Sequence, residues 1–289
     1  MSNQILINIL ISTATYLLVA VSFGEIYRVS KCFHFAHASI YALAAYCAYV
    51  FYKVWSLPLI ISAVLATGLT VALGWSINRY VYYHLQQRGG GSSAIMILSL
   101  GVMIVLQNAI SIIFGDQTLS ISDYHVNEGV QLFGGIITTN QIIMICTSGV
   151  LIISLYIIRR FTVIGKMMNA VACDSLLGTI VGVPVNCVVG LSYVIGSAIV
   201  AVTAILLSFS TDLTPAMGLR AFLMGVVAYI IGGKTLLGVL LGAAFLSLIQ
   251  NVSVFILPGQ WQDTIAFGVL LVILIFRPKL SALEVRVTV

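Results

Sequence analysis

The chain has 289 residues, of which 61% are apolar and only 7% are charged, with 13 basic and 8 acidic side chains. An ordinary soluble domain is roughly a quarter charged, so this composition excludes a soluble enzyme. Since one membrane crossing needs about 20 mostly apolar residues, the apolar content is sufficient for eight or nine of them. The sequence therefore predicts an all-α, polytopic bundle of transmembrane helices that forms a single domain over residues 1–289.

The gaps between charged residues mark the individual spans. Seven charge-free runs are long enough to cross a bilayer, namely 1–24, 32–52, 54–78, 89–115, 129–158, 175–211 and 235–262. Two shorter runs, 221–233 and 264–276, hold 13 residues each. Each of these two either crosses with the help of its flanking residues or enters the membrane as a re-entrant segment.

The basic residues predict the orientation of the bundle, because short cytoplasmic loops are enriched in Lys and Arg. With the N-terminus outside and the C-terminus inside, nine crossings place eleven of the 13 basic residues on the cytoplasmic side: Arg28, Lys31, Arg79, Arg88, Arg159, Arg160, Lys166, Lys234, Arg277, Lys279 and Arg286. Five of the eight acidic residues then lie outside: Asp116, Asp123, Glu128, Asp212 and Asp263. The net charge of +5 is thereby explained by topology, and we expect no nucleic-acid partner.

Two loops stand out by their length. The external loop, 115–141, has β-branched residues on both sides of Gly134-Gly135, a pattern typical of a small hairpin. The cytoplasmic loop, 159–184, has apolar residues at intervals of three to five, with Gly178 and Gly182 as breakers. This spacing predicts two short amphipathic helices joined by a turn. Such helices bury their apolar side either on the membrane surface or in a groove of a soluble partner.

Few side chains in the predicted spans could carry chemistry. His37 lies within an apolar run, where an ionisable group either forms a structural hydrogen bond or lines a pathway. Cys32, His34 and His37 are metal-ligating types, but no acid or fourth ligand accompanies them, so we expect no metal site. Arg220, at the outer end of a span, either binds a substrate carboxylate or extends to the interface.

The segment 33–46 reads FHFAHASIYALAAY, and its Phe35, Ala36, His37, Tyr41 and Ala45 agree with a known signature. The chain resembles, on these residues, the permease subunits of ABC importers of the branched-chain amino acid type. Ser39 stands where that family usually has a glutamate. Residues 217–242 are similar to further motifs of the family, with Arg220 keeping a positive charge.

The cytoplasmic loop is similar to the coupling loop of the same family. Matching positions are Ala170, Ala172, Asp174 and Gly182, while Asn169 stands where an arginine is usual. In that family the loop docks into a groove of a cytoplasmic ATPase. The resemblance therefore implies an ATPase-coupling surface that includes Lys166, Ala170, Ala172, Asp174, Gly178 and Gly182.

The resemblance implies a permease subunit in a bacterial inner membrane. It would form half of a translocation pathway for branched-chain or other small amino acids, or for urea and short amides, with His37, Ser39, Tyr41 and Arg220 as pathway residues. The implied partners are a homologous or identical second permease, two cytoplasmic ABC ATPases, an external solute-binding protein and the lipid bilayer. Gly233-Lys234-Thr235 lacks the first glycine of a phosphate-binding loop, so we expect ATP hydrolysis in the separate subunits, no enzyme here and no cofactor.

Two other functions stay open. An ion-coupled secondary transporter or channel would need an acid within the membrane, and the seven long runs contain none. Glu25, directly after the first run, is expected to form an interfacial ion pair with Arg28 on the next turn. A membrane-embedded metalloenzyme would have to be built on His34 and His37.

Overall fold

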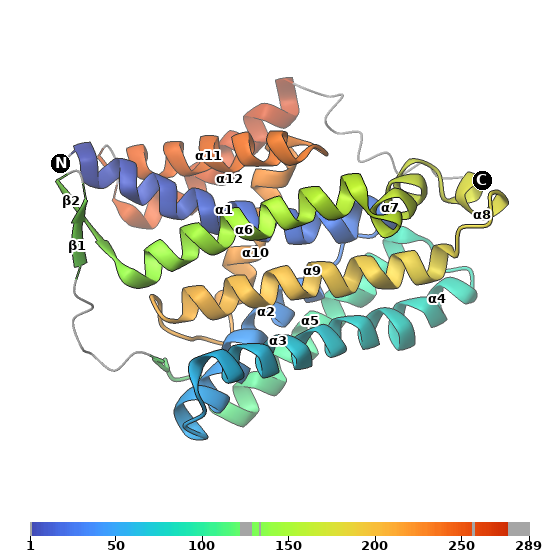
Figure 1. Cartoon of the computed structure of the whole chain (residues 1–289), viewed down its shortest axis with the longest axis horizontal. Helices are drawn as coiled ribbons and strands as arrows, with labels where there is room; N and C mark the ends of the chain where they lie inside the picture. Colours follow the sequence, from blue (N-terminus) through green and yellow to red (C-terminus); the bar gives the residue numbers. More distant parts are fainter. Residues whose placement is uncertain (1, 122–128, 133, 256–257, 277–289) are drawn as a thin grey trace.

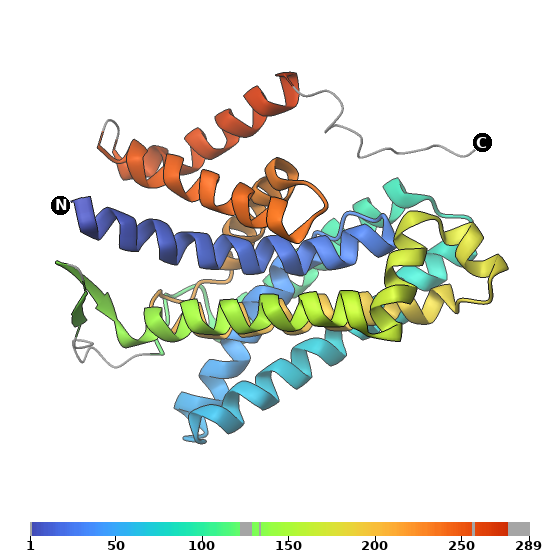
Figure 2. The same cartoon turned by 45° about the horizontal axis from the view of Figure 1, so that its top comes forward.

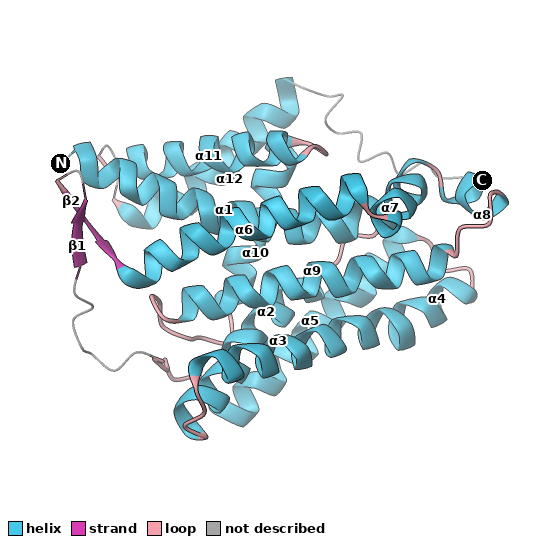
Figure 3. Ribbon diagram, in the orientation of Figure 1, coloured by secondary structure: helices cyan, strands magenta, loops and turns pink. Residues whose placement is uncertain are grey.

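The computed structural model is helical almost throughout (Figure 3). It describes residues 2–121, 129–132, 134–255 and 258–276. Five of the charged residues used for the topology lie outside these described residues, namely Asp123, Glu128, Arg277, Lys279 and Arg286.

Six helices are long and apolar enough to cross a membrane. They are α1 (Ser2–Ser30), α3 (Leu59–Ser76) with its continuation through η2 (Ile77–Tyr82) and α4 (Tyr83–Gln87), α5 (Ser92–Phe114), α6 (Thr139–Phe161), α9 (Val185–Ser208) and α11 (Leu236–Ser253). The charge-free runs predicted all six locations. The predicted ends are less accurate, because α1 continues past Glu25, and the helix that begins as α3 continues past Arg79 to Gln87.

Three shorter apolar helices accompany these six. α2 (Ala36–Tyr49) is extended by a π-helical stretch, η1 (Val50–Val54). The two runs of 13 residues form α10 (Met217–Gly232) and, after the short 3₁₀ turn η3 (Gly259–Trp261), α12 (Gln262–Phe276). Flanking residues lengthen both helices beyond their charge-free runs, to 16 and 15 residues.

The long helices lie side by side, and the chain passes back and forth between two ends of the bundle (Figures 1 and 2). A two-stranded ribbon lies at one end, formed by β1 (Gly129–Leu132) and β2 (Gly135–Thr138). Two short helices, α7 (Val163–Cys173) and α8 (Ser175–Ile180), lie at the opposite end, where α4 also ends. The loop predicted to be external and the loop predicted to be cytoplasmic are thus at opposite ends of the molecule.

The predicted hairpin is confirmed. β1 and β2 pair antiparallel, with Leu132 opposite Gly135, and Gly134 adopts the left-handed conformation that the turn requires. The hairpin is also fixed to α1, because the Gln4 amide donates to the Ile136 carbonyl (3.1 Å) and its oxygen accepts from the Ile136 N–H (2.7 Å). The side chain of Gln4 therefore extends the two-stranded ribbon like a short third strand.

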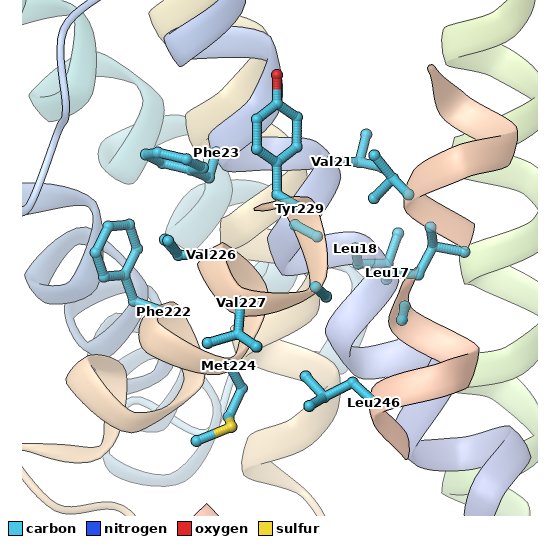
Figure 4. Packing of buried hydrophobic residues seen from close by; sticks show 14 of the residues in the cluster. Leu17, Leu18, Val21, Phe23, Phe222, Met224, Val226, Val227, Tyr229 and Leu246 are labelled. Atoms are coloured by element: carbon cyan, nitrogen blue, oxygen red, sulfur yellow. The ribbon is translucent and has the colours of Figure 1, made fainter. Parts of the chain in front are cut away.

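The core lies where α1 meets α9, α10 and α11. Two thirds of the most apolar window of α9 (67%) and half of that of α1 (50%) are buried, compared with 17% for α5 and α6, so α5 and α6 lie at the periphery. Phe23 of α1 packs edge-on against Phe222 and Tyr229 of α10, with ring centroids 5.5 and 5.7 Å apart (Figure 4). Within a bilayer such close packing, rather than water exclusion, holds helices together.

Candidate functional site

His34 and His37 lie in the interior, around the start of α2, and neither side chain is exposed. Lys31 has a positive φ and begins the five-residue connection that turns the chain from α1 back into the bundle. His34 Nδ1 then lies 2.8 Å from the Tyr82 hydroxyl, and His37 Nε2 lies 2.9 Å from the Ser22 hydroxyl. Each ring is therefore held through one nitrogen by a hydroxyl from a neighbouring helix.

The second nitrogen of each ring has no hydrogen-bond partner among the described residues, although it is buried. The same is true of the hydroxyls of Tyr41 and Ser197, which are also buried around α2 and α9. A buried donor or acceptor left unpaired destabilises a protein by about 1–3 kcal/mol. Such groups can hydrogen-bond a water molecule or the polar part of a solute.

Ser39 faces a different neighbour. Its hydroxyl donates to the Met103 carbonyl of α5 (2.8 Å), so it is already engaged in a helix–helix contact. His37, Ser39 and Tyr41 thus share the buried helix α2, but they point to different groups. Across the described residues, no three His, Cys, Asp or Glu side chains lie close enough together to hold a metal ion.

Arg220 lies apart from this cluster, on the first turn of α10. Its guanidinium forms a two-pronged pair with the Asp263 carboxylate of α12, with N–O distances of 2.8 and 3.1 Å. The Arg220 side chain is two-thirds exposed (67%), so solvent screens this pair. Two residues further, Phe222 places its ring against His37, with centroids 6.2 Å apart, which links the first turns of α10 to the α2 cluster.

The loop predicted to be cytoplasmic forms two helices, as predicted, but Gly178, predicted as a breaker, lies within the second of them. α7 begins at Thr162, whose hydroxyl accepts from the Gly165 N–H, and α8 begins at Asp174, whose carboxylate accepts from the N–H groups of Leu176 and Leu177. These side chains are N-caps, a role typical of Thr and Asp. Gly182, with φ of +84°, ends α8.

α7 and α8 differ in what they cover. α7 buries Met168 and Val171 against the bundle, with Ala170 and Ala172 half-buried and Lys166 exposed. α8 instead exposes an apolar face, formed by Leu176, Leu177, Ile180 and Val181. A groove of about 420 Å³ lies beside it, lined by Ser175, Leu176, Thr179, Val183, Pro184, Val185 and Asn186. Exposed apolar surface of this kind marks a contact site for another protein or for a membrane.

The C-terminal end of α1 carries a charge cluster that differs from the sequence prediction. The predicted ion pair of Glu25 with Arg28 is present (3.4 Å), but the Glu25 side chain is fully buried within the long helix α1 and also pairs with Arg159 of α6. The statement that no acid lies within the spans is therefore wrong, because α1 extends one and a half turns beyond the charge-free run. The sequence analysis did not predict Arg159 as a partner of Glu25. The one available signal was that Arg159-Arg160 has no acid nearby in the sequence to pair with.

The cluster reaches α7, in the loop predicted to be cytoplasmic. Arg28 donates to the Asn169 side-chain oxygen of α7 (2.7 Å), and the Asn169 amide donates to the Arg159 carbonyl (3.3 Å). Nearby, the Lys31 ammonium donates to the Ala172 carbonyl (2.7 Å). Burial, together with the charge of Lys234, lowers the pKa of Lys31. Three of the bonds that hold α7 therefore involve polar groups at the C-terminal ends of α1 and α6.

The sequence matches one protein family over nearly its whole length. The family described as "Branched-chain amino acid transport system / permease component" matches residues 5–274. The chain belongs to this family. It is a transport permease family, not a family of enzymes, and with its six long apolar helices the chain is a multi-pass membrane protein.

Relatives along the whole chain agree with the family. The chain is 28% identical to the high-affinity branched-chain amino acid transport system permease protein BraD of Pseudomonas aeruginosa, over 95% of this chain and 94% of BraD. It is 25% identical to the corresponding protein LivH of Escherichia coli K12, over 92% and 90% of the two chains. The resemblance seen in the sequence is thus confirmed, and the chain is homologous to branched-chain amino acid ABC permease subunits.

A solved structure has the same overall fold as this chain. PsaBC from Streptococcus pneumoniae in complex with Fab superposes with a TM-score of 0.52, over 93% of this chain and 91% of that chain. Sequence identity is 16%, so this likeness concerns the fold alone.

Proposed function

We propose that the chain is the membrane-spanning permease subunit of an ATP-driven importer for branched-chain or other small apolar amino acids. It forms half of the translocation pathway, and ATP hydrolysis takes place in two separate ABC ATPases. The observation that carries this proposal is the exposed apolar face of α8, at one end of a bundle that belongs to a permease family. The relatives BraD and LivH, named as branched-chain amino acid permeases, support the solute class.

The proposed topology has nine crossings, with the N-terminus outside and the C-terminus in the cytoplasm of a bacterial inner membrane. Its support is that α2 with η1, α10 and α12 supplement the six long helices, and that the chain reverses direction from one to the next (Figure 1). The described basic residues also favour it. Arg28, Lys31, Arg88, Arg159 and Lys166 belong to the end of the bundle that carries α7 and α8.

Under this topology each end has its own partner. An ATPase contacts the α8 face and its groove, and an external solute-binding protein delivers the solute at the hairpin end. A second permease subunit, homologous or identical, completes the pathway. Along the pathway, His37 and Tyr41 offer unpaired buried polar atoms, Arg220 offers a positive charge at the outer end, and Ser39 holds α2 against α5.

The buried Glu25 reopens the alternative of an ion-coupled transporter, which needs an acid within the membrane. The geometry argues against this role. Two arginines pair with the carboxylate, so Glu25 is neutralised by fixed cations and not available for a mobile ion or proton. Uptake in vesicles that lack any ATPase would contradict this argument.

Cross-linking tests the proposal. Cys173, exposed at the end of α7, is kept as a single cysteine, and Cys146, exposed along α6, serves as the matched single-cysteine control. In the assembled complex we expect a cross-link from Cys173 to the ATPase and none from Cys146, together with leucine uptake that requires ATP. No cross-link from Cys173 or its neighbours, in a complex shown to be intact, would overturn the importer assignment.

A further inference from the structure

Four residues near the inner surface form one connected unit, which we call the Glu25 clamp: Glu25, Arg28, Arg159 and Asn169. They come from three helices, since Glu25 and Arg28 lie on α1, Arg159 on α6 and Asn169 on α7. The Glu25 carboxylate pairs with both arginines, and Arg28 joins it to Asn169. The clamp therefore connects the short helix α7, at the end of the bundle, to the two long helices α1 and α6.

The clamp is buried, which decides how strongly its members are linked. The Glu25 side chain is fully buried and both arginine side chains are 14% exposed, so the surrounding water and salt screen their charges weakly. Removing one member of such a group leaves a buried charge without compensation. The guanidinium of Arg28 reaches Glu25 with one nitrogen and Asn169 with the other, because it is a rigid planar fork.

Two further contacts fix α7 in the same place. The Lys31 ammonium binds the Ala172 carbonyl, and Gly165 lies directly against the backbone of Ile158 and Arg159, where a larger residue would collide. α7 thus cannot slide freely across the ends of α1 and α6. These contacts attach α7 to both helices.

α1 also contacts the buried polar cluster. Glu25 lies one turn after Ser22, whose hydroxyl is within hydrogen-bond distance of His37. Phe23, between them, packs against Phe222 of α10. A continuous chain of contacts therefore runs from Asn169 through Arg28 and Glu25 along α1 to His37.

We propose that the Glu25 clamp is the device by which movement of α7 is passed to α1, and so to the pathway around His37. The inference rests on the proposed function, in which an ATPase moves the α7–α8 segment. The four residues are positioning residues, and none of them is proposed to touch the solute. A static role would instead hold the loop in shape for ATPase binding, and the two roles give different results when binding, hydrolysis and uptake are measured separately.

The experiment uses the complete importer in proteoliposomes and three variants of this chain. Asn169→Leu removes both hydrogen bonds of the clamp to α7. Asn169→Asp keeps the acceptor for Arg28 and is the rescue variant. Asn108→Leu is the matched control, since the Asn108 amide donates to the Ile104 carbonyl of its own helix, α5, on an exposed face.

We expect Asn169→Leu to co-purify with the ATPase and to hydrolyse ATP, but to take up about tenfold less leucine per ATP. A tenfold loss is the order expected for one charge-assisted hydrogen bond. Asn169→Asp should restore the ratio to within about twofold of the unmodified protein, and Asn108→Leu should leave it unchanged. Arg28→Lys is a second test of the same kind, because an ammonium cannot hold Glu25 and Asn169 in the geometry of the fork.

Three outcomes overturn the inference. If Asn169→Leu loses ATPase binding and uptake in the same proportion, the clamp only shapes the loop. If leucine uptake per ATP is unchanged in both Asn169→Leu and Arg28→Lys, the link to α1 carries no movement. If the unmodified complex shows no ATP-dependent uptake at all, the proposed function fails and the clamp fails with it.

Discussion

Gly218 on the first turn of α10 provides a sharp test of the packing around the buried cluster. A Cβ atom placed there would lie 1.9 Å from the Ala38 carbonyl oxygen, 2.9 Å from the Ala38 carbonyl carbon and 3.2 Å from the Ala42 nitrogen. All three are backbone atoms of α2, which cannot rotate aside as a side chain would. Gly218→Ala must therefore push α10 away from α2.

The expected loss follows from this displacement. Overpacking a well-packed interior destabilises by about 1–3 kcal/mol, and here it also separates Phe222 from His37, one turn further along α10. For a chain of this size, about 2 kcal/mol corresponds to a fall of about 4–8 °C in the midpoint of thermal unfolding. We expect this fall in detergent-purified protein, together with reduced leucine uptake.

The matched control is Gly68→Ala on α3. The Cβ added at Gly68 meets no atom within 4 Å, so no helix has to move. Alanine is the better helix former by about 0.5–1 kcal/mol, and we expect the midpoint to stay or rise slightly. If both alanine variants unfold at the same temperature as the unmodified protein, α10 and α2 do not approach as closely as described.

Three further predictions concern the outer pair, the hairpin and the cysteines. Arg220→Ala, Asp263→Ala and the double variant should show a coupling of at most about 1 kcal/mol in thermal unfolding, because the pair is exposed; a clearly larger coupling would mean that it is buried in the assembled protein. Gln4→Ala removes both bonds to Ile136, so hydrogen exchange of the Ile136 amide should accelerate several-fold, whereas unchanged protection would show that the hairpin is stable without α1. Burial raises the pKa of Cys32, so its thiolate is scarce at neutral pH; an impermeant maleimide should label exposed Cys173 and Cys187 in inverted vesicles, and Cys32 should react at least about tenfold more slowly, even when the pH passes the ordinary thiol pKa of about 8.5. Labelling of Cys173 from the outside of intact cells would contradict the proposed orientation.

The sequence predicted best those features that depend on local composition. Charged side chains are expensive in hydrocarbon, so gaps between them located the helices, including α10 and α12. The hairpin at Gly134-Gly135 depends on a turn within a few residues. The two helices of the 159–184 loop were predicted as well, but the sequence placed a breaker at Gly178, whereas the structure divides them at the helix cap Asp174. In each case the determining interaction lies within about one turn of the chain.

The sequence could not predict pairings between distant residues. Glu25 and Arg159 are 134 positions apart, and only the packing of α6 against α1 brings them together. A charge also ended the predicted span at residue 24, although a charged residue whose partners lie on neighbouring helices can be buried well inside a span. Locating spans as gaps between charged residues treats every charge as the end of a span. This method therefore fails where a charge is buried in an ion pair.

The candidate pathway residues illustrate a related limit. The motif that contains His37, Ser39 and Tyr41 located a buried segment correctly, but it could not distinguish their environments. Ser39 is bonded to α5, whereas His37 and Tyr41 keep unpaired atoms. Arg220 was grouped with them through its charge and the family resemblance around it, and Asp263, its partner, lies on a helix that follows much later in the chain.

α1 connects the regions that the proposed function requires. Near its start Gln4 holds the hairpin, in its middle Ser22 meets His37, and near its end Arg28 holds α7. Among the acidic residues that the structure describes, Glu25 is the one buried side chain. This buried acid lies on α1, the helix that contacts both the hairpin at one end of the bundle and α7 at the other. A rigid α1 would therefore couple the solute-delivery end to the ATPase end. Weakening the contact of Gln4 with the hairpin, or that of Arg28 with α7, should reduce uptake while α1 stays in the core.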